Sequence, residues 1–362
     1  MNNKKITDRE YQILQWIKQN PMIHQDELSK LAGISRSGIA AHISSLMKKG
    51  YIQGKGYVVS PKKYAVVIGG VNADIFGISN SKIMTTTSNS GKVIHSTGGI
   101  GRNIALNLTK LNIYSYLISA YGDDFSGNQF REDSRQNELD ITYSKQFSNT
   151  ATSSYIYIND TSGNRVIGLD DMEINNFITP SFLSERMEII KNANEVIVDT
   201  NIPEDSIKWI LDNYEGSIYI KAVSILKTKR LLTLLDRIDT LVINGVESPI
   251  ISGKEIKNKD DVIKNAEKII SKGVKNVFIY TENYGMLYAS KDNKCFIENN
   301  IDNRENTNGM GASVTAALVL ANRMNLDFCK TAQLGYKAAN ITSKSIDSVS
   351  NRISDKELLN DL

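Results

Sequence analysis

The residues with the clearest capacity for chemistry form a glycine-rich turn in front of a helical pattern, Gly98-Gly99-Ile100-Gly101-Arg102-Asn103-Ile104-Ala105. Glycines at the start of a helix let the backbone approach a bound molecule closely, because they carry no Cβ. The amide of Asn103 can both donate and accept hydrogen bonds, which suits a ligand rich in hydroxyl groups. This segment therefore predicts a binding site for a small polar molecule.

Three further segments place glycines beside polar residues. They are Gly69-Gly70-Val71-Asn72-Ala73-Asp74 after the first apolar run, Asn244-Gly245-Val246-Glu247 after a later one, and Asn306-Thr307-Asn308-Gly309-Met310-Gly311 before a small-residue helix over 312–321. The chain has no GxxxxGK[ST], which excludes a P-loop, and no GxGxxG followed by an acidic residue about 20 positions later. Of the three functions that we weigh for this chain, a dinucleotide-dependent oxidoreductase therefore ranks last.

The elements that must position these segments alternate along the chain. Short apolar runs at 64–68, 196–198, 218–220, 241–243 and 277–279 suit strands buried on both faces, and helical patterns at 206–213 and 260–272 lie between them. Strands that alternate with helices predict right-handed βαβ units in a doubly wound, mainly parallel α/β sheet. Segments 81–97 and 151–169 break the pattern with β-branched residues and polar turns, and we predict that they form a small β lid.

Taken in this order, the motifs resemble those of the ribokinase/PfkB family of sugar and nucleoside kinases over about residues 64–350. The glycine-rich first helix, Asn244-x-x-Glu247, the late glycine loop and Gly122-Asp123-Asp124 carry the resemblance, although the two aspartates equally suit a helix cap. Within the family, the sequence is most similar to pseudouridine-kinase-like members. The similarity lies in the attached head described below and in Asp171-Met172, Asp199-Thr200-Asn201 and the tail around 347–350.

The resemblance implies a role for each motif. Asp74 and Asn103 would bind sugar hydroxyls, and Gly98 and Gly99 would let the sugar ring approach. The lid would close over the substrate. Asn244 and Glu247 would organise the Mg²⁺ and phosphate region, Glu247 indirectly, in a kinase that uses ATP and Mg²⁺. Gly309 and Gly311 would present backbone N–H groups as an anion hole for the transferred phosphoryl group.

The sequence departs from the family pattern at the catalytic base. The pattern D-T-x-G-A-G-D ends on an aspartate that takes the proton from the attacking hydroxyl, and the aligned residue here is Ala312. A methyl group accepts no proton, and general-base catalysis is typically worth about 10²–10⁴-fold. Neither Asp302 nor Glu305 is placed to substitute for it.

Other departures gather around the same nucleotide side. Asn306 replaces the leading aspartate of the pattern, Lys221-Ala222 stands where pseudouridine-kinase-like members have Asp-Pro, and Glu282 stands in place of a glycine. The sugar side of the pattern is intact. Several separate changes indicate a natural loss of the reaction rather than a single engineered substitution.

The first 60 residues predict a separate DNA-binding domain, with the kinase-like domain at 61–362. Thr7 with Glu10 suits a capping box for the first helix, Leu28 and Leu31 would point inward from a second helix, and Ser35 can cap a third helix running to Lys49. With a hairpin over 51–59 as the wing, this is the order of a winged helix-turn-helix. A three-helix packing or dimerisation module is the alternative.

In that geometry the third helix enters the major groove of double-stranded DNA. Arg36, Ser37 and His42 would face base edges, and Lys48, Lys49 and Lys55 would contact phosphates. The charge distribution agrees, because the head carries nine Lys/Arg against four Asp/Glu while the whole chain has a net charge of only +3.

Composition narrows the classes of protein to which this chain can belong. Of the 362 residues, 41% are hydrophobic and 23% are charged, as in ordinary globular proteins. No apolar run reaches the about 18 residues of a membrane span, and Cys295 and Cys329 cannot build a disulfide framework or a CxxC zinc site. These features predict a cytoplasmic protein that contacts no membrane.

Two functions compete on these observations. The first is a ligand-sensing transcriptional regulator, acting as a homodimer, whose kinase-like domain binds a sugar or nucleoside and has weak or lost phosphotransfer. The second is an active ATP-dependent carbohydrate or pseudouridine kinase that uses an unusual base. The motifs leave the identity of the sugar or nucleoside open.

Overall fold

A computed structural model describes residues 6–53, 63–161, 165–298, 307–360 and 362. The body is built on a twisted sheet with the strand order β14-β13-β12-β11-β10-β9-β1-β4. The strands β12, β11, β10, β9, β1 and β4 run parallel to one another, β13 is antiparallel to β12, and β14 is antiparallel to β13. The strands are β1 (Ala65–Ile68), β4 (Ser115–Ile118), β9 (Glu195–Asp199), β10 (Ser217–Lys221), β11 (Thr240–Asn244), β12 (Asn276–Tyr280), β13 (Met286–Ser290) and β14 (Lys294–Ile297). This confirms the doubly wound, mainly parallel sheet.

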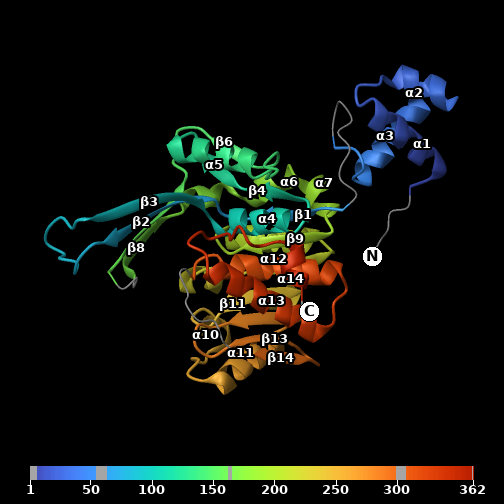
Figure 1. Ribbon diagram of the computed structural model, residues 1–362. Coiled ribbons are helices and arrows are strands. Elements are labelled where there is room, and N and C mark those ends of the chain that lie inside the picture. The colour runs from blue at the N-terminus through green and yellow to red at the C-terminus, as the bar shows by residue number, and fades with distance from the viewer. Residues whose placement is uncertain (1–5, 54–62, 162–164, 299–306, 361) are drawn as a thin grey trace.

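Helices cover both faces of this sheet (Figure 1). Successive residues of a strand point to opposite faces, so Val66 and Ile68 belong to one apolar core and Ala65 and Val67 to the other. The second core is closed by α4 (Ile100–Lys110), α5 (Phe125–Gln136), α12 (Met310–Arg323), α13 (Phe328–Ser343) and α14 (Asp355–Leu359). The first is closed by α6 (Pro180–Ser184), α7 (Met187–Lys191), α8 (Glu204–Asn213), α10 (Ser248–Ser252) and α11 (Lys259–Ser271).

Short elements complete the body. The strands β5 (Ala120–Gly122) and β6 (Lys145–Phe147) pair in parallel, and α9 (Ile225–Thr228) follows β10. Three 3₁₀ turns span Glu173–Phe177, Lys229–Leu231 and Leu235–Arg237 in the described residues. Asp124 caps α5, since its Oδ1 accepts from the backbone N–H of Gly127 at 2.8 Å. The structure therefore contains the helix cap that was the alternative interpretation of this aspartate.

A second sheet projects from the body as a lid, in the order β3-β2-β7-β8 (Figure 1). Its strands are β2 (Asn72–Ser79), β3 (Gly91–Gly98), β7 (Ser153–Asn159) and β8 (Arg165–Asp171). The lid was predicted from 81–97 and 151–169, and the first of these contains only β3. Its partner β2 was missed, because we interpreted Asn72 to Asp74 as the end of a glycine loop. The pairing of Asp74 with Ser96 shows that this loop continues directly into a lid strand.

The head consists of α1 (Asp8–Gln19), α2 (Gln25–Ala32) and α3 (Arg36–Lys48) around their own small core. Thr7 and Glu10 form the predicted capping box, and Ser35 caps α3. Leu28 is buried as predicted, whereas Leu31 is 53% exposed, which contradicts its predicted inward position. Since α2 has only eight residues, the inward face is filled by Leu28 and Ala32, one turn apart, and Leu31 lies beside that face. Most of the predicted wing lies outside the described residues.

Candidate functional site

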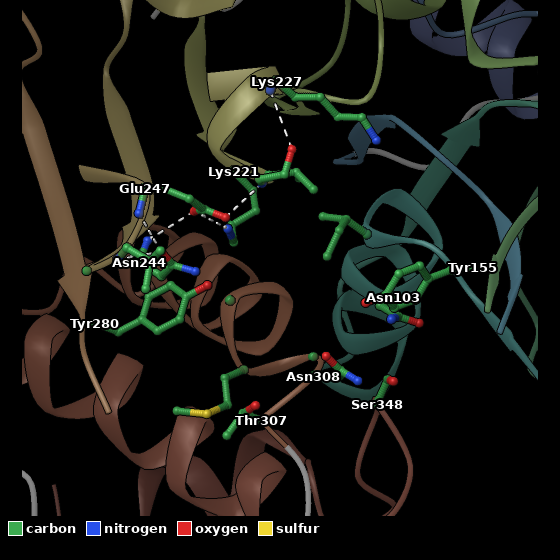
Figure 2. A pocket seen from close by; sticks show the side chains of 18 of the residues that line it. Asn103, Tyr155, Lys221, Lys227, Asn244, Glu247, Tyr280, Thr307, Asn308 and Ser348 are labelled. Atoms are coloured by element: carbon green, nitrogen blue, oxygen red, sulfur yellow. Dashed lines mark hydrogen bonds and ion pairs between the residues drawn. The ribbon is translucent and has the colours of Figure 1, made fainter. Parts of the chain in front are cut away.

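A cavity of about 700 Å³ opens at the carboxyl ends of the parallel strands, between the lid, α4 and the start of α12. This is the edge where doubly wound sheets bind their ligands. Figure 2 shows Asn103 and Tyr155 across the cavity from Lys221, Asn244, Glu247 and Tyr280. Of the residues predicted from the sequence, the cavity brings together Asp74, Gly99, Asn103, Asn244, Glu247, Gly309 and Gly311. Gly98 lies directly beneath Asp74, and Ala312 is not part of the lining.

The side of the cavity that is predicted to bind the sugar is built by the beginning of the lid. The Nδ2 of Asn72 donates to Oδ1 of Asp74 at 2.5 Å, which orients the carboxylate. A Cβ on Gly98 would lie 2.1 Å from Oδ2 of Asp74, so only glycine leaves room for this side chain. Gly99 has φ of +101° and packs against the backbone of Gly70, a position that also requires glycine. These two glycines thus allow close packing within the protein itself, Gly98 against Asp74 and Gly99 against Gly70.

Asn103 is held in one orientation from behind. Its Oδ1 accepts a hydrogen bond from Nη1 of Arg102 at 3.0 Å. Arg102 is itself fixed by a bidentate pair with Asp133 of α5, with distances of 2.7 and 2.8 Å from Nη2 to the two carboxylate oxygens. A bidentate arginine has a rigid geometry. The amide of Asn103 is therefore preoriented at the edge of the cavity before any ligand arrives.

A buried carboxylate holds the glycine turn after β1 against the turn after β9. Asp199, at the end of β9, accepts from the backbone N–H of Gly70 at 2.9 Å and of Asn201 at 2.7 Å. Burial raises the pKa of Asp199 above its usual range, although these two backbone donors act in the opposite direction. A Cβ on Gly69 would lie 2.2 Å from Oδ2 of Asp199, so Gly69 provides the space for this link.

Glu247 is the centre of the predicted phosphate side. Its Oε1 accepts from the backbone N–H of Ser224 at 2.8 Å, and its Oε2 accepts from the backbone N–H of Asn244 at 3.3 Å. The side chain of Asn244 folds back onto the turn, where its Oδ1 accepts from the N–H groups of Val246 and Glu247 at 2.9 and 2.8 Å. Ser224 has φ of +55°, a strained conformation for a residue other than glycine, and this conformation directs its N–H to Glu247.

Lys221 is the side chain that sequence reasoning noted as a departure and to which it gave no role. Its ammonium lies 3.6 Å from Oε2 of Glu247, donates to the carbonyl of Ala222, and lies 5.5 Å from the centre of the Tyr280 ring. Burial alone would lower the pKa of Lys221, but the carboxylate of Glu247 and the neighbouring Tyr280 outweigh it and raise the pKa above its usual value. This buried lysine therefore carries its charge in the wall of the cavity as the partner of Glu247.

The N-terminal turn of α12 faces the same region. Gly309 has φ of +87°, and a Cβ on Gly311 would lie 2.1 Å from Cε of Lys221. The first turn of this helix contains no acidic residue. Ala312 is fully buried in the apolar core. The methyl group at the predicted position of the base therefore does not reach the lining of the cavity. Asp302, Glu305 and Asn306 lie outside the described residues.

Among the described residues, the donor set on the predicted phosphate side fits an anion but not a divalent cation. Mg²⁺ prefers several oxygen ligands in octahedral geometry. Glu247 is the predicted contributor, and its carboxylate already accepts two backbone N–H groups and pairs with Lys221. An ammonium at this distance repels a metal ion. No cluster of three or more His, Cys, Asp or Glu side chains that could hold a metal occurs among the described residues.

Two contacts connect the lid with the body across the cavity. Lys227 of α9 donates to Oδ2 of Asp170 on β8 at 3.1 Å and to Oδ1 of Asn201 at 2.9 Å. Asn308, next to Gly309, donates to the hydroxyl of Tyr157 on β7 at 3.4 Å. Sequence reasoning missed Lys227, Asp170 and Tyr157, although the alternation of the lid strands, once paired correctly, places Tyr157 and Asp170 on the cavity side with Tyr155.

The predicted DNA-contacting residues occupy different environments on the head. Arg36, Ser37 and Lys48 are exposed and His42 is half-buried, all on α3. Arg36 also pairs with Asp26 at 3.5 Å. Lys49 is instead directed to Glu10, with Nζ 2.7 and 2.8 Å from the two carboxylate oxygens, so it contributes to the stability of the head. Lys55 lies outside the described residues.

Comparison with known proteins agrees with this geometry. The family model described as pfkB family carbohydrate kinase matches residues 62–352, and the one described as winged helix-turn-helix DNA-binding matches residues 6–53. The chain is 31% identical to the uncharacterized sugar kinase YeiI of Escherichia coli K12, over 81% of each chain. It is 32% identical to the pseudouridine kinase of the same organism, over 63% of this chain and 73% of that protein.

Solved structures show the same fold. A carbohydrate kinase from Agrobacterium tumefaciens superposes with a TM-score of 0.69 at 24% identity, over 82% of this chain and 95% of that one. Arabidopsis thaliana ribokinase complexed with ribose and ATP gives a TM-score of 0.69 at 22% identity, over 82% and 99%. The fold and cavity thus define a ribokinase-like domain that follows a winged helix-turn-helix domain. The chain belongs to the pfkB family of carbohydrate kinases.

Proposed function

We propose that this protein is a ligand-sensing transcriptional regulator, in which the kinase-like domain binds a sugar or nucleoside and phosphotransfer is weak or lost. The observation that carries the proposal is the contrast within one cavity. The sugar side, Asp74 and Asn103, is preorganised by Asn72 and Arg102. On the phosphate side, Ala312 is a buried methyl group where the family pattern has its base.

The head supplies the output of such a sensor. Its third helix exposes Arg36, Ser37 and Lys48 on one element, as recognition helices that enter the major groove do. The Nε2 of Gln53 donates to the hydroxyl of Tyr116 on β4 at 2.7 Å, so the end of the head touches the body. A protein that binds chromosomal DNA must share a compartment with that DNA, and this requirement agrees with the predicted cytoplasmic location. No helix in the described part of the chain is long and apolar enough to cross a membrane.

The proposal makes three measurable statements about the full chain. We expect turnover below about 0.1 s⁻¹ in a coupled ADP-release assay with pseudouridine, ribose and fructose, against about 1–10³ s⁻¹ for ordinary enzymes. We expect calorimetry to find a ligand among nucleosides, sugars and their phosphates. We also expect that ligand to change the affinity for a duplex, selected from a random pool, by about 5–150-fold in gel shifts.

Arg36→Ala is the matched control, since this exposed residue is remote from the cavity. The variant should lose most of its affinity for the selected duplex and keep its affinity for the ligand. Tight ligand binding without any change in DNA affinity contradicts the regulator.

The alternative function is an active ATP-dependent carbohydrate or pseudouridine kinase. It is favoured by the presence of Asn244, Glu247, Gly309 and Gly311 around one cavity. The same assay decides between the two functions, because turnover well above about 0.1 s⁻¹ supports the kinase.

A regulator that reads two half-sites acts as a dimer, and we propose the outer face of the lid as the contact between two copies. Ile156 and Leu169 pair across β7 and β8, as do Ile158 and Ile167, on the face opposite Tyr155 and Asp170. All four are at least 40% exposed. Adjacent apolar side chains of this kind mark association surfaces.

Replacing Leu169 and Ile167 together by Glu should therefore convert the dimer to a monomer. Burying two carboxylates in an apolar contact is strongly unfavourable. Light scattering coupled to size-exclusion chromatography would measure the mass, with Lys208→Gln on α8 as the control. A wild-type monomer at micromolar concentration would contradict the prediction.

A further inference from the structure

The part of the cavity next to α12 contains a built-in positive charge. Lys221 reaches it from the end of β10, and its stem packs so closely on Gly311 that no side chain fits there. Its ammonium is paired with Glu247 and lies beside Tyr280. We propose that the cavity binds a sugar or nucleoside that already carries a phosphomonoester, and that it does so without a divalent cation. This inference rests on the ligand-sensing function proposed above.

The argument for a phosphate begins with the arrangement of donors. The 14-residue helix α12 begins at the cavity, and Gly309 and Gly311 leave the backbone of its first turn accessible at the lining. Such a turn presents N–H groups and the positive end of the helix dipole. The ammonium of Lys221, which is paired with Glu247, lies beside it, and Ala312 contributes no carboxylate that would repel a phosphate. An anion is the ligand that these groups suit.

The argument for a sugar on the same molecule comes from the opposite wall. Asp74 and Asn103 line the cavity with oriented oxygen and amide groups, which suit hydroxyls rather than charge. One ligand that satisfies both walls carries hydroxyls at one end and a phosphate at the other. Sugar and nucleoside kinases produce molecules of this class, so a kinase reaction catalysed by another enzyme would supply the ligand.

The argument against a metal follows from the charge balance. Where pseudouridine-kinase-like members and the family pattern have aspartates, this chain has Lys221 and Ala312, and Glu282 stands in place of a glycine, which makes the described part of the region two charges more positive than that pattern. Leaving out Mg²⁺ removes two positive charges. The protein therefore supplies from its own side chains the charge that a metal ion supplies elsewhere. A triphosphate carries several negative charges and normally binds together with Mg²⁺, so a single phosphate suits the ammonium of Lys221 better.

Calorimetry on the full chain tests the inference with matched probes. These are pseudouridine against its 5′-monophosphate, ribose against ribose 5-phosphate, and ATP, each in EDTA and in millimolar Mg²⁺. We expect at least one phosphorylated probe to bind about tenfold or more tightly than its unphosphorylated partner, with the same affinity in EDTA and in Mg²⁺. Equal affinity within each pair, binding that needs Mg²⁺, or preference for ATP would overturn the inference.

Variants test whether Lys221 is responsible for the tighter binding of a phosphorylated probe. Lys221→Gln should weaken the binding of the phosphorylated probe by about tenfold or more, and Lys208→Gln on the surface of α8 should leave it unchanged. Because Lys221→Gln leaves Glu247 buried without its partner, the double variant Lys221→Gln/Glu247→Gln provides a second form with no unpaired charge. Its affinity should be reduced by a similar factor. Wild-type affinity in a folded double variant, checked by thermal melting, would overturn the role of Lys221.

Gel shifts with the selected duplex keep this inference separate from the proposed function. A phosphorylated probe that binds without metal but leaves DNA affinity unchanged supports the inference and contradicts the regulator. An unphosphorylated ligand that alone changes DNA affinity supports the regulator and contradicts the inference.

Discussion

The double variant Ala312→Asp/Lys221→Asp is expected to phosphorylate a sugar or nucleoside at least about 100-fold faster than the wild-type chain in the presence of Mg²⁺, because a positioned base is worth about 10²–10⁴-fold. Ala312→Asp alone is expected to gain less than about tenfold. A new carboxylate next to Gly311 would lie close to Lys221, which packs on that glycine, and would pair with the ammonium. A carboxylate in such a pair is a weaker base, and the lysine still repels a metal ion.

A coupled ADP-release assay measures this result, with Ala312→Asn/Lys221→Asp as the matched control that has the shape of the new side chain without its basicity. Thermal melting must accompany it, since Ala312 is buried in the apolar core and a carboxylate there costs stability. If Ala312→Asp alone restored full turnover, Lys221 would be compatible with phosphotransfer, and its proposed role as a substitute for the metal would be wrong.

The parts of the fold that sequence predicted well are those in which one periodic pattern decides the structure. The run at 64–68 has no polar residue on either face, which suits a strand in the middle of a parallel sheet, and β1 lies there between β9 and β4. The capping box of Thr7 and Glu10 is equally local, because both partners lie within one helical turn. In such cases the neighbours in sequence are also the neighbours in space.

Predictions failed where partners come from distant segments. Strand β2 contains Gly77 and begins with polar residues, and its identity depends on pairing with β3 and β7. The role of Lys221 depends on Glu247 and Gly311, which lie 26 and 90 positions further along the chain. The sequence showed that Lys221 was unusual in a family pattern. Only the three-dimensional arrangement shows that its ammonium pairs with Glu247 and that its stem packs on Gly311 at the start of α12.

The second large effect concerns the head, where Glu10 and Lys49 hold α1 against the end of α3. Glu10 is only 3% exposed and accepts from Lys49, from Oγ of Ser45 at 2.6 Å and from the backbone N–H of Thr7 at 2.7 Å. Burial alone would raise the pKa of Glu10, but these hydrogen bonds outweigh it and lower the pKa from 4.5 to about 2. At about 1.4 kcal/mol per pKa unit, the ionised carboxylate contributes about 3 kcal/mol to the free energy of unfolding.

Glu10→Gln should therefore reduce the stability of the head by about 2–3 kcal/mol at pH 7. The folded pKa lies below the unfolded one, so the contribution is complete above the unfolded value and decreases as the pH falls from about 5 toward 2. The difference between wild type and variant should accordingly shrink by more than half between pH 5 and pH 3.

Urea titrations of the full chain would measure this, followed by the fluorescence of Trp16 in a Trp209→Phe background, since these are the two tryptophans of the sequence. Glu27→Gln on the exposed face of α2 is the control and should change the head by less than about 0.5 kcal/mol. A difference that stays constant from pH 7 to pH 3 would mean that the ion pair contributes nothing through its charge. Lys49 would then be available for the DNA phosphate contact first predicted for it.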